Sequence, residues 1–82
     1  MSVVVYSKNH CPYCDRAKAL LQQYNVSFEE INLDGDMDAI IALKERTGMR
    51  TFPQIFIHDE LVGGFDQLNA LHQTDQLAGK LA

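Results

Sequence analysis

Cysteine is scarce in this chain, which has two among its 82 residues, Cys11 and Cys14. A secreted domain held together by disulfides typically carries about four to eight cysteines at wider spacings, so that class is excluded. In a reducing compartment, a pair at this spacing is more often catalytic or metal-binding than structural. We therefore expect a cytoplasmic protein whose two cysteines carry out chemistry.

Basic charge and long apolar runs are also lacking. Seven Lys and Arg residues stand against 11 Asp and Glu residues, for a net charge of −4, so no nucleic-acid partner is indicated. No apolar run approaches the ~20 residues that span a bilayer, and no membrane partner is expected. The segment Met1–Val5 lacks the basic residues that open a signal peptide. The 46% hydrophobic content argues against disorder.

Linkers, repeats and low-complexity segments are absent, so residues 1–82 are expected to form one α/β domain. The predicted order is β-α-β-α-β-β-α. The first β-α-β should be a right-handed parallel unit, with a hairpin adding antiparallel strands and helices covering both faces. Hydrophobic periodicity predicts strands at 2–6, 30–33, 54–57 and 60–62, and helices at 12–25, 37–48 and beyond 64, the last interrupted around 73–75.

The start of the first helix brings the cysteines together. Pro12 suits position N1 of a helix, because its missing N–H would be unpaired there. Cys11 then becomes the N-cap, where a thiolate accepts free backbone N–H groups and sits at the positive end of the helix dipole. Three basic side chains against one acidic between residues 8 and 18 add to this effect. We expect the pKa of Cys11 to be lowered, which makes it a good leaving group in thiol exchange.

Cys14 lies one helical turn after Cys11, so it can resolve a mixed disulfide on Cys11. A structural staple is the plain alternative, but closing so short a loop contributes only about 2 kcal/mol in the chain-entropy model. Structural zinc requires four ligands, and the three scattered histidines supply no second pair. No metal is expected.

Three segments in order resemble the signatures of dithiol glutaredoxins, and the length and first helix resemble the short bacterial members of that family. The segments are Cys11-Pro12-Tyr13-Cys14, Thr51-Phe52-Pro53-Gln54-Ile55-Phe56-Ile57 and Gly63-Gly64-Phe65-Asp66. The resemblance implies a thioredoxin-like fold with a four-stranded mixed sheet in the order 2-1-3-4. It implies that strands three and four run antiparallel to the first two, and that the Phe52–Pro53 peptide is cis.

The resemblance also implies an activity: glutathione-dependent reduction of protein disulfides and of glutathione mixed disulfides. Cys11 would be the nucleophile, Cys14 the resolving thiol, and glutathione the co-substrate. The implied glutathione-binding residues are Lys8, Tyr13, Thr51, Phe52, Pro53, Gly64, Phe65 and Asp66. In this arrangement Lys8 suits the glycyl carboxylate, the N–H groups after Gly64 suit the γ-glutamyl carboxylate, and Asp66 suits the ammonium group.

Plain alternatives remain for several of these residues. Asp66 could be only a helix N-cap, and Lys8 only a solvated lysine. His10 could tune Cys11 or point away from it, and Arg50 could add to the glycyl-carboxylate site.

Two residues depart from the family pattern. Phe52 stands where valine is common, and Gln67 where a second aspartate is common; both bear on glutathione affinity and partner preference.

Two other functions stay open. One is an iron–sulfur carrier that holds a cluster between two protomers. The other is a glutaredoxin-like electron donor reduced by thioredoxin reductase. The expected partners are glutathione and disulfide-containing or glutathionylated proteins, with ribonucleotide reductase suggested by the resemblance, and the chain is expected to be a monomer.

Overall fold

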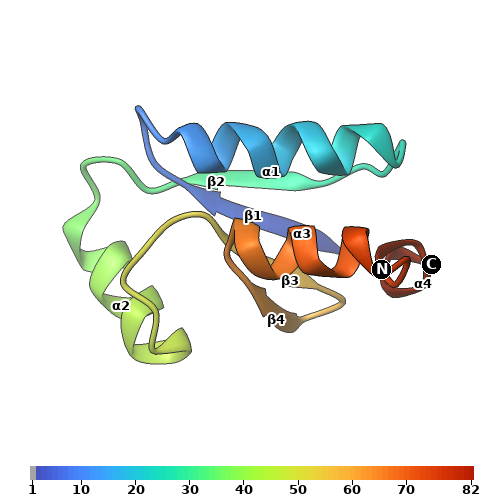
Figure 1. Cartoon of the computed structure of the whole chain (residues 1–82). Helices are drawn as coiled ribbons and strands as arrows, with labels where there is room; N and C mark the ends of the chain where they lie inside the picture. Colours follow the sequence, from blue (N-terminus) through green and yellow to red (C-terminus); the bar gives the residue numbers. More distant parts are fainter. Residues whose placement is uncertain (1) are drawn as a thin grey trace.

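The computed structural model describes residues 2–82, so the part of the signal-peptide argument that concerns Met1 lies outside the described residues. The elements follow the predicted order (Figure 1). They are β1 (Val3–Ser7), α1 (Pro12–Gln23), β2 (Glu29–Asn32), α2 (Met37–Thr47), β3 (Gln54–Ile57), β4 (Glu60–Gly63), α3 (Phe65–Gln73) and α4 (Leu77–Leu81). Within residues 2–82, no helix combines the length and hydropathy needed to cross a membrane.

The four strands form one sheet in the order β2-β1-β3-β4, as expected. Strands β1 and β2 are parallel, and β3 is antiparallel to β1, with Val5 opposite both Glu30 and Ile55. Strand β4 is antiparallel to β3 and therefore runs in the same direction as β1. The expectation that both hairpin strands oppose the first two is wrong for β4. The His58-Asp59 turn, with φ values of 51° and 65°, reverses the chain a second time.

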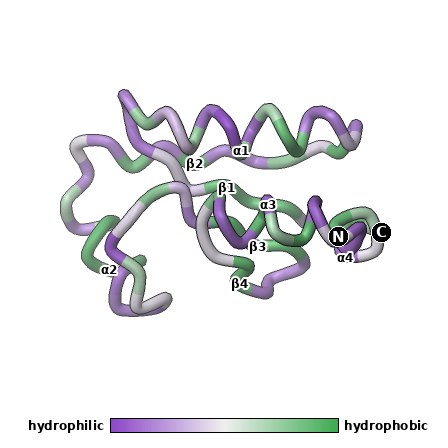
Figure 2. Tube along the Cα trace, viewed as in Figure 1, coloured by the Kyte–Doolittle hydropathy of each residue, from purple (hydrophilic) through white to green (hydrophobic). Residues whose placement is uncertain are grey.

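Helices cover both faces of the sheet, as predicted. On one face, Val3 and Val5 of β1 belong to a core that includes residues of α1, α3 and α4. On the other face, Val4 and Tyr6 pack with the smaller cluster that α2 completes through Leu43. The alternation of β1 between the two cores follows from the two-residue period of a strand. Figure 2 shows hydrophobic and hydrophilic stretches alternating along α1, as in a helix with one buried side.

Local hydrogen bonds determine where the elements end. Helix α1 stops at Gln23, two residues before the predicted end, because the chain turns at Asn25, whose φ is 54°. Strand β1 extends to Ser7, since the Ser7 carbonyl accepts the N–H of Leu33. Helix α2 begins after its N-cap, Asp36, and ends before Gly48, the C-cap, whose φ is 75°. The expected interruption separates α3 from α4.

Candidate active site

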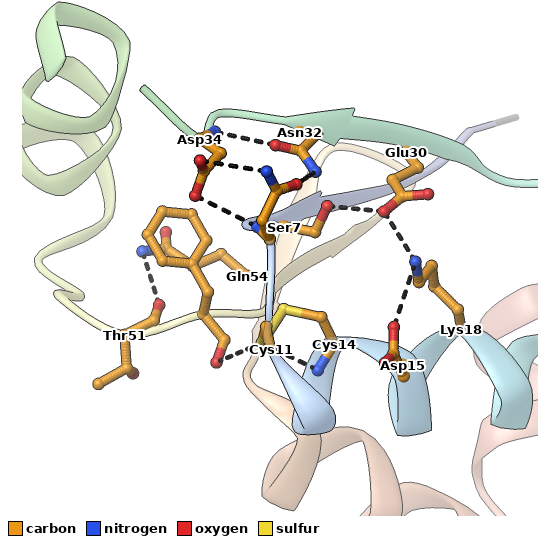
Figure 3. The surroundings of a disulfide bond; sticks show 12 residues. Ser7, Cys11, Cys14, Asp15, Lys18, Glu30, Asn32, Asp34, Thr51 and Gln54 are labelled. Atoms are coloured by element: carbon orange, nitrogen blue, oxygen red, sulfur yellow. Dashed lines mark hydrogen bonds and ion pairs between the residues drawn. A yellow bond between two sulfur atoms is a disulfide. The ribbon is translucent and has the colours of Figure 1, made fainter. Parts of the chain in front are cut away.

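Cys11 and Cys14 form a disulfide at the start of α1 (Figure 3). Cys11 is the N-cap, in extended conformation, and Pro12 follows at N1. The Cys11 Sγ accepts the backbone N–H of Cys14 at 3.1 Å. The predicted placement of both cysteines is therefore confirmed, and the helix directs one of its free N–H groups at the sulfur of Cys11.

The two sulfurs differ in their access to solvent. Cys14 is 1% exposed, whereas Cys11 is partly exposed. An external thiolate can therefore approach Cys11 and not Cys14. Its attack forms a bond to the Cys11 sulfur, breaks the Cys11–Cys14 bond and releases Cys14 as a thiolate. This asymmetry suits an exposed nucleophile paired with a buried resolving thiol.

The segment before β3 faces the disulfide. The Phe52–Pro53 peptide is cis, as the family resemblance implies. The carbonyl oxygen of Phe52 lies 3.7 Å from the Cys11 Sγ. A disulfide sulfur carries no hydrogen, so this is a contact in the oxidised form; a protonated Cys11 thiol could donate to the same oxygen.

A groove of about 330 Å³ opens beside this contact. It brings together seven of the eight residues expected to bind glutathione; the exception is Lys8. The groove is lined by Tyr13, Met49, Thr51, Phe52, Pro53, Gly64, Phe65, Asp66 and Gln67. Segments far apart in the sequence thus meet at one surface: the first turn of α1, the chain before β3 and the start of α3.

Lys8 lies at the margin of the groove. It is exposed, and its Nζ atom lies 5.8 Å from the centroid of the Phe52 ring, within the range of a cation–π interaction. His10 is exposed and has a φ of 56°, immediately before Cys11.

The N-cap of α3 is not the residue that one of the alternatives from the sequence proposed. Gly64 is the N-cap, so the reading of Asp66 as an N-cap is wrong. The Gln67 Oε1 atom accepts the Gly64 N–H at 2.8 Å, because a glutamine at N3 can reach back to the cap. Asp66 is exposed in the first turn of α3 and lines the groove.

Sequence reasoning missed two lining residues. It treated Gln67 only as the loss of a charge, although a glutamine three residues after a cap position was a usable signal. It did not single out Met49, whose loop position carries no chemical signature.

Aromatic side chains form the rim on the α1 side. The rings of Tyr13 and Phe65 lie 6.0 Å apart between centroids, which joins the first turn of α1 to the start of α3. The Arg16 guanidinium lies 5.3 Å from the centroid of Tyr13. Tyr13 is 54% exposed, so its ring is available to an incoming substrate.

A polar network fixes α1 to the sheet near the disulfide (Figure 3). Glu30 accepts hydrogen bonds from Lys18 at 2.9 Å and from Ser7 at 2.7 Å. The bond from Lys18 is the main reason that the pKa of Glu30 lies below its ordinary value, and the bond to Glu30 is the main reason that the pKa of Lys18 is raised. Lys18 therefore stabilises a Cys11 thiolate less than the local charge count suggested, because its charge is compensated by Glu30.

Among residues 2–82, no group of three or more His, Cys, Asp and Glu side chains has an arrangement that could hold a metal ion.

Several known proteins are similar to this chain. The family model described as glutaredoxin matches residues 3–62. The chain belongs to the glutaredoxin family. Glutaredoxin 3 of Escherichia coli K12 is 47% identical over 70 residues, which cover 85% of this chain and 84% of that protein. A glutaredoxin of Pseudomonas aeruginosa is 44% identical over 80 residues, or 98% and 95% of the two chains.

Solved glutaredoxins have the same fold. A wheat glutaredoxin superposes with a TM-score of 0.92 at 39% identity, covering 99% of this chain and 79% of that one. A buckwheat glutaredoxin, solved in complex with glutathione, gives 0.89 at 38% identity, covering 96% and 74%. With its Cys11–Cys14 disulfide, this chain is a dithiol glutaredoxin with the thioredoxin-like fold, a glutathione-disulfide oxidoreductase.

Proposed function

We propose that the groove beside Cys11 binds the glutathione moiety of a mixed disulfide and positions its sulfur for attack by Cys11. The observation that carries this proposal is the position of the groove. Phe52 lines it and also places its carbonyl oxygen 3.7 Å from the Cys11 Sγ. A tripeptide lying along the groove would therefore have its cysteine next to the reactive sulfur.

The reaction proceeds by two exchanges. The Cys11 thiolate attacks the glutathione sulfur of a glutathionylated protein, and the protein leaves as a thiolate that takes a proton from water. A second glutathione thiolate then attacks the glutathione sulfur bound to Cys11, which releases glutathione disulfide and restores the Cys11 thiolate. With a protein disulfide as substrate, the Cys11 thiolate first attacks one of its sulfurs and releases the other as a thiolate. Cys14 then attacks the Cys11 sulfur of this mixed disulfide, which breaks its bond to the substrate, releases the second substrate thiolate and forms the disulfide described above.

The polar groups around the groove complement the charges of glutathione. The first backbone N–H groups of α3 suit the γ-glutamyl carboxylate, and the Asp66 carboxylate suits the ammonium group. Lys8 lies beside Phe52, which lines the groove, and its ammonium group suits the glycyl carboxylate. The backbone of Phe52 supports the cysteinyl amide as a short strand would.

The physiological setting is part of the same proposal. We propose that residues 1–82 act as one monomeric domain in the cytoplasm. The protein partners would be disulfide-containing and glutathionylated proteins, with a ribonucleotide reductase as one candidate. Support comes from the two-cysteine composition and from the single sheet with a core on each face.

Steady-state reduction of a glutathionylated peptide, with glutathione and glutathione reductase, tests the groove. Asp66→Asn should raise KM for the peptide about fivefold, since an exposed ion pair contributes up to about 1 kcal/mol. Asp75→Asn is the matched control, because Asp75 lies beyond the far end of α3 and should leave KM unchanged. Equal KM values for the two variants would contradict the proposed groove.

Two further measurements test the other two functions. Reduction of the oxidised protein by thioredoxin reductase and not by glutathione would favour the alternative electron source. A visible absorbance band after anaerobic reconstitution with iron and sulfide would favour the cluster carrier. We expect neither result.

A further inference from the structure

Gln54 is a buried polar residue beside the groove. It is the first residue of β3, directly after Pro53, and is 1% exposed. A buried carboxamide without partners would cost about 1–3 kcal/mol, so its hydrogen bonds require a physical account. Within residues 2–82, no buried side-chain nitrogen or oxygen is left without a partner.

The Gln54 carboxamide binds the loop that precedes it, residues 48–53. Its Nε2 atom donates to the carbonyl oxygens of Met49 and Thr51, each at 3.1 Å. Its Oε1 atom accepts the Thr47 hydroxyl at 2.8 Å. Only this orientation of the amide works, because the flipped form would place its oxygen against two carbonyl oxygens.

Thr47 completes the network from the end of α2. Its hydroxyl oxygen accepts the backbone N–H of Met49 at 3.1 Å. Its single hydrogen can be donated to Gln54 at 2.8 Å or to the Leu43 carbonyl at 3.0 Å. The 48–53 loop is thus bound from both ends by two side chains that themselves contact each other.

Packing holds most of this loop weakly. Arg50 and Thr51 are exposed, Met49 and Phe52 are only partly buried, and Pro53 at the end of the loop is its one buried side chain. Yet the loop supplies one wall of the groove, and its Phe52 carbonyl lies 3.7 Å from the Cys11 Sγ. The hydrogen bonds from Thr47 and Gln54 therefore fix the position of this wall of the groove.

We propose that the Thr47–Gln54 pair positions the 48–53 loop for glutathione binding, while the reactivity of Cys11 depends on α1. Gln54 and Thr47 are positioning residues that act through Met49, Thr51 and Phe52. The inference rests on the proposed glutathione groove and adds to it the determinant of its geometry. It predicts that affinity and thiol reactivity can be changed separately.

Gln54→Met tests this separation, because methionine keeps the length of glutamine without its hydrogen bonds. KM for the glutathionylated peptide should rise about tenfold, with kcat within about twofold, since two loop carbonyls lose their partners and turn toward water. The reduced variant should react with a dipyridyl disulfide, which lacks the peptide groups of glutathione, at the rate of the parent. A KM within twofold of the parent value would overturn the inference.

Two controls keep the result interpretable. Ile57→Val removes packing from the far end of β3, where Ile57 is 3% exposed, and should lower stability without changing KM. Thr47→Val should raise KM about fivefold, and Thr47→Ser, which keeps the hydroxyl, should restore it. If Gln54→Met does not fold, the Thr47 pair decides: equal KM values for its two members would overturn the inference.

Failure of the inference differs from failure of the proposed function. If the parent protein shows no saturation with glutathionylated peptide, or Asp66→Asn has no effect on KM, the groove itself is wrong. If Asp66→Asn raises KM and neither Gln54→Met nor Thr47→Val does, the groove stands and the positioning role is wrong.

Discussion

The backbone N–H of Cys14 points at the Sγ of Cys11 and donates a hydrogen bond to it at 3.1 Å. The resolving residue thus supports the nucleophile through its backbone, while its own sulfur is buried. In the reduced protein the same N–H would stabilise the Cys11 thiolate, together with the N-terminal end of α1.

This geometry predicts that the pKa of the Cys11 thiol is lowered. Absorbance of the thiolate measured against pH should place the Cys11 pKa below about 7, against about 8.5 for an unperturbed thiol. Cys14→Ser should retain this transition, because serine keeps the backbone N–H. A transition near the unperturbed value in that variant would show that the N-cap does not stabilise the thiolate.

The backbone conformation of Gly63 predicts that Gly63→Ala and Gly79→Ala change the stability of the protein in opposite directions. Its φ is +123°, and an added Cβ would lie 2.9 Å from the Cγ of Gln67. Gly63→Ala should therefore lower the free energy of unfolding by about 1–3 kcal/mol. Gly79→Ala, in α4 with nothing within 4 Å of the added carbon, should raise it by up to about 1 kcal/mol. Urea denaturation measures the free energy of unfolding of both variants. A similar loss of stability in the two would show that the positive φ of Gly63 and its contact with Gln67 do not require glycine.

The Lys18–Glu30 pair predicts a pH dependence of stability. The pKa of Glu30 is lowered in the folded protein, so its contribution is fully present above the ordinary carboxyl value of 4.5 and is lost as pH falls through the lower folded pKa. Glu30→Gln should cost roughly 0.5–1 kcal/mol at neutral pH and nothing at the acid end. Urea midpoints from neutral to acid pH, with Glu29→Gln as the matched control, measure this difference. A constant loss across the range would mean that the effect is not ionic.

Much of the site could be predicted because its signals are local. Pro12 after Cys11 identifies a helix start within two residues, and the structure has the cysteines where that signal puts them. The run of three valines in β1 and the glycine that follows α2, Gly48, are equally short-range signals.

Contacts between residues far apart in the sequence could not be predicted in the same way. Glu30, 12 positions along the chain, compensates the charge of Lys18. A count of the charges in residues 8–18 does not include Glu30. The groove joins the first turn of α1 to Met49 and Gln67, and only the folded chain brings them together. The predicted hairpin already reversed β4 relative to β3, so the expectation that β4 opposes β1, which came from the resemblance, was inconsistent with that hairpin.

The most direct test exchanges each cysteine for serine and measures reduction of a glutathionylated peptide by glutathione. If Cys11 is the exposed nucleophile and Cys14 the buried resolving thiol, Cys14→Ser should retain at least about half of the parent kcat/KM, because glutathione itself completes this cycle. Cys11→Ser should lose at least about a hundredfold, since no other accessible sulfur can attack. Activity that survives in Cys11→Ser, or is lost in Cys14→Ser, would contradict these roles.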